Sequence, residues 1–569
     1  MNQDFRFILE YKEDGVIKRS QGKDCELYTV KETYENDVLR LVIEPKKPIE
    51  LVNAYVTCAF DYQDGDRVYV NGYQSWTTSR EFQKTDVQRG LQGLGKYRPV
   101  WDFTHIFGDY DFQCYSKEAG VFHSYSYTYV KRAGKIILMG SLTERNGFTV
   151  FHFDMNKNSL CIQKDVEGVT ITEPYALHEV YFVEDDYEAA FDAYFALLPI
   201  KKPRFDRMTG YTSWYNYYGN ITEEILLRDL DGLSTMGDKA SIFQIDDGYQ
   251  VQVGDWLTLK QDKYPNGMKP IVDKIHGYGY KAGLWLAPFN AQKSKSMVAR
   301  DHLDWMVKGA DGRPEIGCIA WGGAYTIDID IPEAKEYVRS VFKGVFDDWG
   351  FDMVKLDFLY SICHTPRHNK SRGQLMTEAM EFLRECAGEK IILGCGVPLF
   401  PAFGLVDFCR ISSDVGKSYK DPFYASQSNQ EIFSTRCAMN NSIFRRHLDG
   451  RAFRNDPDVF YLRDCDLTGK DPLWIKRTGK LKFTKEQQYL LAEVNSMCGN
   501  VLFVSDNIGG YSEEQRAKLV ECFTPTDRKV LDAEFVAPTK IDITYVDGKG
   551  EKYVLNFDTI TGENSTKKL

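Results

Sequence analysis

Residues 353–358 read Met-Val-Lys-Leu-Asp-Phe, and residues 406–414 read Val-Asp-Phe-Cys-Arg-Ile-Ser-Ser-Asp. Each stretch is a short apolar run that predicts a buried strand and leads into an aspartate, Asp357 or Asp414. In an eight-stranded parallel barrel the carboxyl ends of the strands carry the chemistry. A pair of carboxylates facing one pocket is the minimum that glycoside cleavage requires. The two stretches therefore predict a barrel enzyme that cleaves sugars, with Asp357 and Asp414 as its catalytic groups.

The same strand–loop–helix pattern extends to both sides and predicts a (β/α)8 TIM barrel over residues 201–510. Helix starts are expected at Thr222, Ser371 and Thr484, and at Asp330, which forms a capping box with Glu333. The eight expected strands are Thr209–Ser213, Ser241–Ile245, Lys281–Leu286, Met353–Leu356, Ile391–Gly394, Val406–Ile411, Asp458–Leu462 and Val501–Val504.

Two further domains flank the barrel, so the fold class is multidomain α/β and β. Residues 1–200 contain many short strands separated by turn signals such as Asn71-Gly72, which predicts an N-terminal β-sandwich. A short helix, Asp185–Leu198, and the segment Pro199–Pro203 mark its end. Strand signals return from about Glu513, so residues 511–569 are expected to form a small C-terminal antiparallel β-domain.

Polar or aromatic residues follow successive barrel strands. Asp246 and Asp247 form a pair that could accept hydrogen bonds from adjacent sugar hydroxyls, or could form an Asx-turn ahead of Gly248. Lys355 lies two residues before Asp357 and shares its strand face, where we expect it to keep Asp357 ionised. The other residues in this series are Trp214, Tyr215, Trp285, Cys395 and Arg410.

Composition excludes several classes of partner. The formal net charge of −11, with no basic stripe, argues against nucleic acid and against an anionic membrane surface. The N-terminus is charged and no apolar window is long enough to span a membrane. The 13 cysteines are scattered without paired spacing, which indicates reduced thiols and a cytoplasmic protein.

Other catalytic signatures are weak. The string Thr326–Ile331 resembles a DxD motif, but an N-cap role for Asp330 is enough to explain it. His364 and His368 have helical spacing that Pro366 interrupts, so no metal site is expected there. Phosphate-binding, dinucleotide-binding and serine-hydrolase motifs are missing, and no cofactor is expected.

With these motifs together, the chain resembles glycoside hydrolase family 36, the α-galactosidases of clan D, and particularly their shorter bacterial and archaeal members. The resemblance extends over all three domains. It is carried by Ser213-Trp-Tyr, Ile245-Asp-Asp-Gly, Gly283-Leu-Trp-Leu-Ala-Pro288, Lys355-Leu-Asp-Phe, Gly394-Cys-Gly-Val-Pro398 and Arg410-Ile-Ser-Ser-Asp414.

The resemblance implies a role for each matching residue. Asp357 would be the nucleophile and Asp414 the general acid/base, while Asp246 and Asp247 would bind the 4- and 6-hydroxyls. Lys355 and Arg410 would hold the 2- and 3-hydroxyl side, with the Arg410 guanidinium turned toward the substrate. Trp76 would reach the pocket rim from the sandwich, and Trp214, Tyr215 and Trp285 would line the walls. The loop at Cys395 departs from the Cys-Ser-Gly-Gly-Gly of longer members and would face the C2 substituent.

The expected activity is therefore that of a retaining, exo-acting α-galactosidase on terminal α-galactosides of the melibiose or raffinose type. α-N-Acetylgalactosaminidase and raffinose-synthase-like transglycosidase activities remain as alternatives with the same chemistry. A non-catalytic carbohydrate-binding protein and a metal-dependent phosphohydrolase are the alternatives from other classes. The chain could also form a homo-oligomer that completes the pocket.

Overall fold

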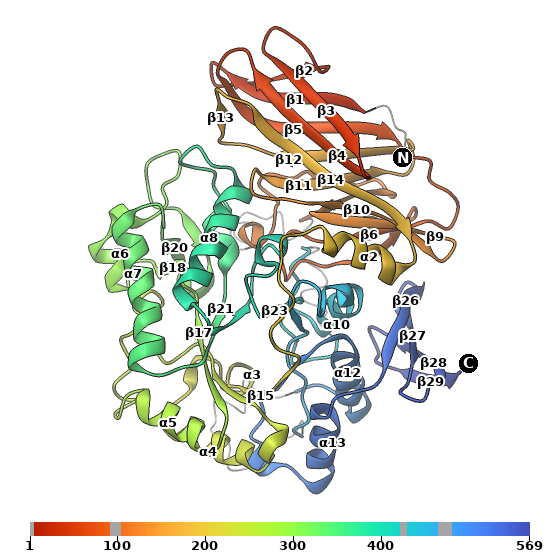
Figure 1. Ribbon diagram of the computed structural model, residues 1–569. Coiled ribbons are helices and arrows are strands. Elements are labelled where there is room, and N and C mark those ends of the chain that lie inside the picture. Colours follow the sequence, from red (N-terminus) through yellow and green to blue (C-terminus); the bar gives the residue numbers. More distant parts are fainter. Residues whose placement is uncertain (1–4, 92–103, 421–428, 465–480) are drawn as a thin grey trace.

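The computed structural model describes residues 5–91, 104–420, 429–464 and 481–569. Figure 1 shows an N-terminal pair of β-sheets, a central barrel surrounded by helices, and a small C-terminal sheet beside the barrel. This arrangement confirms the expected fold class.

The N-terminal domain is a sandwich of two seven-stranded antiparallel sheets. Alternation of buried and exposed residues along its strands, as in β5, places one face of each sheet in a shared core. The first sheet contains β2 (Val16–Gln21), β1 (Arg6–Glu13), β5 (Ile49–Ala59), β12 (Ser159–Asp165), β11 (Phe148–Asp154) and β8 (Val121–Tyr125), with β13 (Thr170–Ile171) paired to β5. The second contains β3 (Tyr28–Glu35), β4 (Val38–Pro45), β14 (Tyr175–Asp185), β10 (Lys135–Ser141), β9 (Tyr127–Arg132), β6 (Arg67–Val70) and β7 (Arg80–Gln83).

Helix α2 (Tyr187–Ala196) connects the sandwich to a barrel of eight parallel strands. Their residues are almost all buried, as expected for strands covered by side chains on both faces. The strands are β15 (Met208–Thr212), β16 (Ile242–Ile245), β17 (Lys281–Leu286), β21 (Met353–Leu356), β22 (Ile391–Gly394), β23 (Phe408–Arg410), β24 (Arg454–Asp456) and β25 (Val501–Val504). β25 pairs with β15, and a parallel bridge from Phe460 to Val504 joins the remaining edges.

The seventh strand was predicted wrongly. The run Asp458–Leu462 is apolar and buried, but the ladder with β23 is made by β24, before Pro457. Proline has no amide hydrogen to continue the ladder, so the strand ends there. Of the apolar residues that follow, Phe460 forms the single bridge to Val504 of β25 and the others are buried outside any strand, and hydrophobicity alone could not separate the two cases.

The barrel helices include α3 (Trp214–Tyr217), α4 (Glu223–Ser234), α5 (Lys269–Gly277), α6 (Met297–Asp301), α7 (Pro332–Lys343), α8 (Arg372–Ala387), α10 (Thr435–Phe444) and α12 (Lys485–Cys498). The caps at Thr222, Ser371 and Thr484 are confirmed. The capping box at Asp330 is wrong, because Ile331 is the N-cap of α7 and the Asp330 carboxylate pairs with Lys370 at 2.6 Å.

Two segments lie outside the regular barrel. A three-stranded sheet, β18 (Asn290–Gln292), β19 (Ile316–Cys318) and β20 (Ala324–Thr326), is inserted between β17 and α7. The C-terminal sheet contains β26 (Lys529–Ala537), β27 (Lys540–Val546), β28 (Lys552–Asp558) and β29 (Asn564–Lys568). Strand signals were expected from Glu513, but residues Glu513–Phe523 form helix α13. Among the described helices, none combines the length and apolarity that a membrane crossing demands.

Candidate active site

Asp357 directly follows β21 and is buried, with 7% of its surface exposed. The Trp285 indole donates to its Oδ2 at 3.0 Å, and the Phe358 amide donates to its Oδ1 at 2.8 Å. Burial raises the pKa of Asp357, whereas Lys355 and hydrogen bonds from Trp285 and Cys395 lower it. Phe358 has a positive φ of 54°, an unfavourable backbone conformation for a bulky residue and of the kind found at functional sites.

Lys355 makes its direct ion pair with Asp246, and its charge also lowers the pKa of Asp357, the influence expected of it. Its Nζ lies 2.8 Å from Asp246 Oδ2, and both side chains are buried. Burial alone would lower the pKa of Lys355, but the charges of Asp246, Cys395 and Asp357 together outweigh it and raise the pKa above its usual value. Gln244 also donates to Asp246 Oδ2, at 3.0 Å. The ion pair therefore connects the ends of the second and fourth barrel strands.

Asp247 is held by two residues that the sequence analysis did not single out. Gln250 donates to its Oδ1 at 2.6 Å, and the Trp321 indole donates to its Oδ2 at 2.9 Å. Burial raises the pKa of Asp247, while these two hydrogen bonds lower it. Trp321 lies in the turn between β19 and β20 of the inserted three-stranded sheet. Its contact with Asp247 therefore depends on how this sheet packs against the barrel.

The Arg410 guanidinium, which was expected to be turned toward the substrate, has three carboxylate partners in the protein. Its guanidinium pairs with Asp414 at 3.0 Å, Asp456 at 3.3 Å and Asp458 at 2.7 Å. The Tyr215 hydroxyl donates to Asp458 Oδ2 at 2.6 Å. Asp456 and Asp458 were missed because the seventh strand was misplaced; Asp456 is the last residue of β24, and Asp458 follows it after Pro457.

Asp414 and Asp357 differ in exposure. Asp414 keeps 35% of its side chain exposed, while Asp357 is buried. The charge of Asp414 raises the pKa of Asp357, so the two carboxyl groups lie within electrostatic range of one another. One buried carboxylate and a second, more exposed one are an arrangement that can act on a substrate bond from two directions.

Trp76 belongs to a loop of the sandwich that enters the barrel. Its ring is buried and packs edge-to-face on Phe358, the residue after Asp357, at 5.2 Å between centroids. A Cβ added to Gly396 would lie 2.9 Å from Trp76 Cζ2 and 3.2 Å from Asp357 Oδ1. With its φ of +56°, position 396 therefore requires glycine. The sandwich thus supplies a wall next to Asp357.

Arg445 fixes this loop and was also missed from the sequence. It is fully buried, and its guanidinium donates to the carbonyls of Gln74 at 3.0 Å and Ser75 at 2.5 Å. The same group donates to the carbonyl of Ile411, next to Arg410, at 2.9 Å. Nothing in the sequence distinguishes Arg445 from a surface arginine, because its acceptors are backbone atoms far away along the chain.

The remaining predicted wall residues have different positions. Trp285 and Tyr215 contact the site through Asp357 and Asp458. Cys395 follows β22 and is buried against Asp357. Trp214 packs edge-to-face on Tyr218 and is half-buried, and the structure connects it to neither catalytic candidate directly.

One cluster in the described part of the chain has metal-ligand chemistry: Asp328, Asp330 and His368. Its carboxylates already have cationic or imidazole partners. Asp328 pairs with His368 at 2.8 Å and with Arg367 at 3.2 Å, and Asp330 pairs with Lys370. The cluster lies apart from the carboxylates at the strand ends.

Residues 212–383 match the family model described as Melibiase. The chain is 24% identical over 184 residues to the α-galactosidase of Escherichia coli, a match that covers 30% of this chain. It spans only 25% of the length of that curated relative.

Structural similarity to known α-galactosidases extends over more of this chain than sequence similarity does. TtGalA, the α-galactosidase of Thermus thermophilus solved with p-nitrophenyl α-D-galactopyranoside, aligns with a TM-score of 0.67 at 22% identity, covering 91% of this chain and 99% of that one. The family 36 α-galactosidase AgaA of Geobacillus stearothermophilus aligns with a TM-score of 0.59 at 11% identity, covering 98% and 79%. Together with the family match over residues 212–383, these likenesses bear out the resemblance read from the sequence, and the chain shares the fold of the family 36 α-galactosidases.

Proposed function

We propose that the chain is a retaining, exo-acting α-galactosidase that hydrolyses terminal α-galactosides of the melibiose or raffinose type. The observation that carries the proposal is the pair Asp357 and Asp414, which follow β21 and β23, two parallel strands of one barrel separated by β22, with the charge of Asp414 acting on Asp357. The family match over residues 212–383 supports it. TtGalA was solved with an aryl α-galactoside and with stachyose, which indicates the kind of substrate to test.

Asp357 is the proposed nucleophile. Trp285 and Phe358 hold its two oxygens by hydrogen bonds and so fix the direction of attack. Their donors, with the charge of Lys355, favour the ionised form that a nucleophile needs, against the opposing effect of burial. Attack on the anomeric carbon breaks the glycosidic bond and forms a covalent β-galactosyl ester.

Asp414 is the proposed general acid/base. In the first step its proton passes to the leaving oxygen, and in the second it takes a proton from water that hydrolyses the ester, with net retention. Its partial exposure suits contact with the leaving group and with water. A retaining enzyme needs a separation of about 5–5.5 Å between the two carboxyl groups.

Asp246 and Asp247 are the proposed partners of the 4- and 6-hydroxyls. Asp246 Oδ1 and both oxygens of Asp247 each accept one hydrogen bond from a neighbour and retain acceptor capacity for a sugar hydroxyl. Asp246 Oδ2 is already occupied by Lys355 and Gln244. Fixed acceptors of this kind discriminate strongly between sugar epimers, because a misplaced hydroxyl leaves a buried carboxylate unpaired.

A cytoplasmic location remains a prediction.

The decisive experiment uses external nucleophiles. Asp357→Gly should lose turnover of an aryl α-galactoside by a factor on the order of 10⁴, and azide should restore a reaction that gives the β-galactosyl azide. Asp414→Gly should give the α-galactosyl azide, because azide then attacks the galactosyl ester. Asp347→Asn, a change on the exposed side of the barrel, serves as control and should keep wild-type rates.

Two results would refute the assignment. One is near wild-type activity of Asp357→Gly on the aryl α-galactoside. The other is release of β-galactose by the wild-type enzyme as the first product, observed by proton NMR. A panel of aryl α-galactoside, α-N-acetylgalactosaminide and α-glucoside substrates, followed by product analysis with excess acceptor sugar, separates hydrolysis from the alternative activities.

A further inference from the structure

Asp458 is a buried carboxylate that the proposed mechanism does not use. It follows β24 after Pro457, and its side chain is 0% exposed. The Tyr215 hydroxyl donates to its Oδ2 at 2.6 Å, and the Val415 amide donates to the same oxygen at 2.7 Å. Because Val415 directly follows Asp414, Asp458 holds the backbone beside the proposed acid/base.

Arg410 connects the two carboxylates a second time. Its guanidinium lies 2.7 Å from Asp458 Oδ1 and donates to Asp414 Oδ1 at 3.0 Å. The same guanidinium donates to Asp456 Oδ2 at 3.3 Å. Arg410 is buried, so this one positive charge faces three carboxylates with little screening by water.

Three carboxylates around one guanidinium leave an excess of negative charge. Carboxylates that share a site repel one another, so one of them keeps a proton at a pH at which a solitary carboxylate is ionised. Burial raises the pKa of Asp458, the charge of Arg410 lowers it, and the charges of Asp414 and Asp456 raise it, to about 7 in all.

Other ionisable groups also border this cluster. In the described part of the chain they are Tyr215, Tyr461, Cys395, Asp357, Lys355 and, beyond the Tyr461 ring, Arg463. Burial raises the pKa of Tyr215, Tyr461 and Cys395 well above the usual values, so all three are uncharged at neutral pH. The charge of Lys355 is compensated by its ion pair with Asp246.

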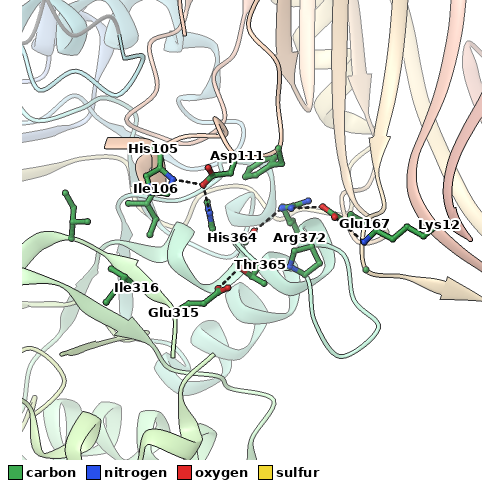
Figure 2. Close-up of a pocket in the computed structure, with 14 residues that line it drawn as sticks. Lys12, His105, Ile106, Asp111, Glu167, Glu315, Ile316, His364, Thr365 and Arg372 are labelled. Carbon is green, nitrogen blue, oxygen red and sulfur yellow. Dashed lines mark hydrogen bonds and ion pairs between the residues drawn. The ribbon is translucent and has the colours of Figure 1, made fainter. Parts of the chain in front are cut away.

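The cavity between the sandwich and the barrel has the opposite arrangement, as Figure 2 shows. There one carboxylate, Asp111, lies between two imidazoles, 2.6 Å from His105 and 3.0 Å from His364. Burial raises the pKa of Asp111, but its hydrogen bonds with the two histidines outweigh this effect and lower the pKa. One carboxylate between several basic groups is kept ionised, whereas several carboxylates around Arg410 compete for one cation.

We propose that Asp458 is a positioning residue for Asp414: around Arg410 the two carboxylates share one proton, and Asp458 keeps Asp414 able to deliver it to the leaving group. Without Asp458, the guanidinium at 3.0 Å would favour an ionised Asp414, which cannot act as an acid. When the proton passes from Asp414 to the glycosidic oxygen, both carboxylates are ionised around Arg410, and water returns a proton to Asp414 in the second step. The inference rests on the proposed role of Asp414.

The test is the pH profile of kcat/KM for galactose release from melibiose. Because the acid must be protonated, the basic limb of this profile reports loss of the shared proton. Asp458→Asn removes one of the two carboxylates that repel each other, so the limb should move to lower pH by about one unit or more. Activity above the limb should then fall about tenfold or more. On 2,4-dinitrophenyl α-galactoside, whose leaving group needs no proton, the same variant should change kcat/KM little.

Tyr215→Phe is the second variant. It removes a hydroxyl that favours the ionised form of Asp458, so the basic limb should move in the opposite direction, to higher pH. The maximum of kcat/KM should fall, because more of the shared proton then resides on Asp458. A purely structural role of Asp458 predicts no such pair of opposite shifts.

Asp407→Asn is the matched control. Asp407 is also buried and paired with two arginines, Arg204 at 2.7 Å and Arg384 at 3.0 Å, and it accepts a hydrogen bond from the Ile392 amide at 3.0 Å. It precedes β23, at the end of the strand away from the proposed active site. Its replacement should leave the basic limb at the wild-type pH.

A basic limb that stays at the wild-type pH in folded Asp458→Asn, or that does not move upward in Tyr215→Phe, would refute the proposal. If thermal unfolding shows that Asp458→Asn does not fold, the direction of the shift in Tyr215→Phe decides alone. Near wild-type rates in Asp414→Gly would show that the proposed function is wrong. If Asp414→Gly behaves as expected but the limb does not move in the other two variants, only the pairing of Asp414 with Asp458 is wrong.

Discussion

Replacing Arg445 by lysine tests whether the sandwich loop that carries Trp76 is held in place by one buried side chain. The guanidinium donates to five acceptors: the Asn71 side chain and the carbonyls of Gly72, Gln74, Ser75 and Ile411. A lysine ammonium has three hydrogens, so at least two of these acceptors lose their donor. Each buried polar group left unpaired costs about 1–3 kcal/mol, so the loop should be destabilised by about 2–6 kcal/mol.

Hydrogen–deuterium exchange measures this loss locally. The Ser75 amide is protected by a bond to the Val397 carbonyl at 2.9 Å. If the loop opens more easily by 2 kcal/mol or more, its exchange should accelerate at least about thirtyfold. Because Trp76 packs beside Asp357, kcat/KM on an aryl α-galactoside should also fall, on the order of tenfold to a hundredfold.

Arg451→Lys is the matched control, because Arg451 also connects the barrel to the sandwich side through Glu188 at 2.8 Å and Asp192 at 2.7 Å. These partners are exposed, so the change should cost at most about 1 kcal/mol. If Arg445→Lys exchanges at the wild-type rate around Ser75 and keeps its kcat/KM, the loop is held by other contacts and the reasoning is wrong.

Three further predictions concern charge and hydrogen bonding around the site. Lys355→Met removes the main influence that lowers the pKa of Asp357, so the pKa of Asp357 should rise. Because the nucleophile must be ionised, the acidic limb of the pH profile of kcat/KM should move to higher pH. An unmoved limb would contradict the role of Lys355. Trp321→Phe removes the indole that donates to Asp247 at 2.9 Å. Steady-state kinetics should show KM raised about tenfold with a smaller change in kcat. An unchanged KM would show that Asp247 does not depend on this contact. Burial raises the pKa of Glu431 from 4.5 to about 7, so the folded state favours its protonated form and stability is lost as pH rises from about 5 to 8. The difference of 2.5 units corresponds to about 3 kcal/mol at most, and calorimetry should find that Glu431→Gln abolishes this part of the pH dependence; a wild-type pH profile in the variant would contradict it.

The sequence was a good guide to residues at the ends of barrel strands. Asp246, Asp247, Asp357 and Arg410 follow strands or end them, as predicted, because parallel strands have a regular apolar pattern and a polar residue stands out at its end. The same reasoning failed at Asp458, where the apolar run after Pro457 was more strand-like than the true strand before it.

Partners across the barrel could not be predicted in the same way. Lys355 was expected to act on Asp357 because the two share a strand face, and its charge does so, but its ion pair with Asp246, 109 positions earlier, was not predicted. Arg410 was expected to face the substrate, yet three carboxylates surround it. Such pairings depend on barrel curvature and side-chain rotamers, and a sequence pattern specifies neither.

The position of Trp76 explains why the sandwich and the barrel occur together in one chain. Trp76 packs on Phe358, whose backbone is held at positive φ directly after Asp357, and Gly396 leaves room for the indole ring. Without the sandwich loop, the ring of Phe358 would lose this neighbour, and water could reach the buried side of Asp357. Water there would weaken both the hydrogen bonds to Asp357 and the electrostatic effect of Lys355. The sandwich therefore contributes directly to the environment of the proposed nucleophile, and a barrel expressed alone should fold poorly around this site even if its strands form.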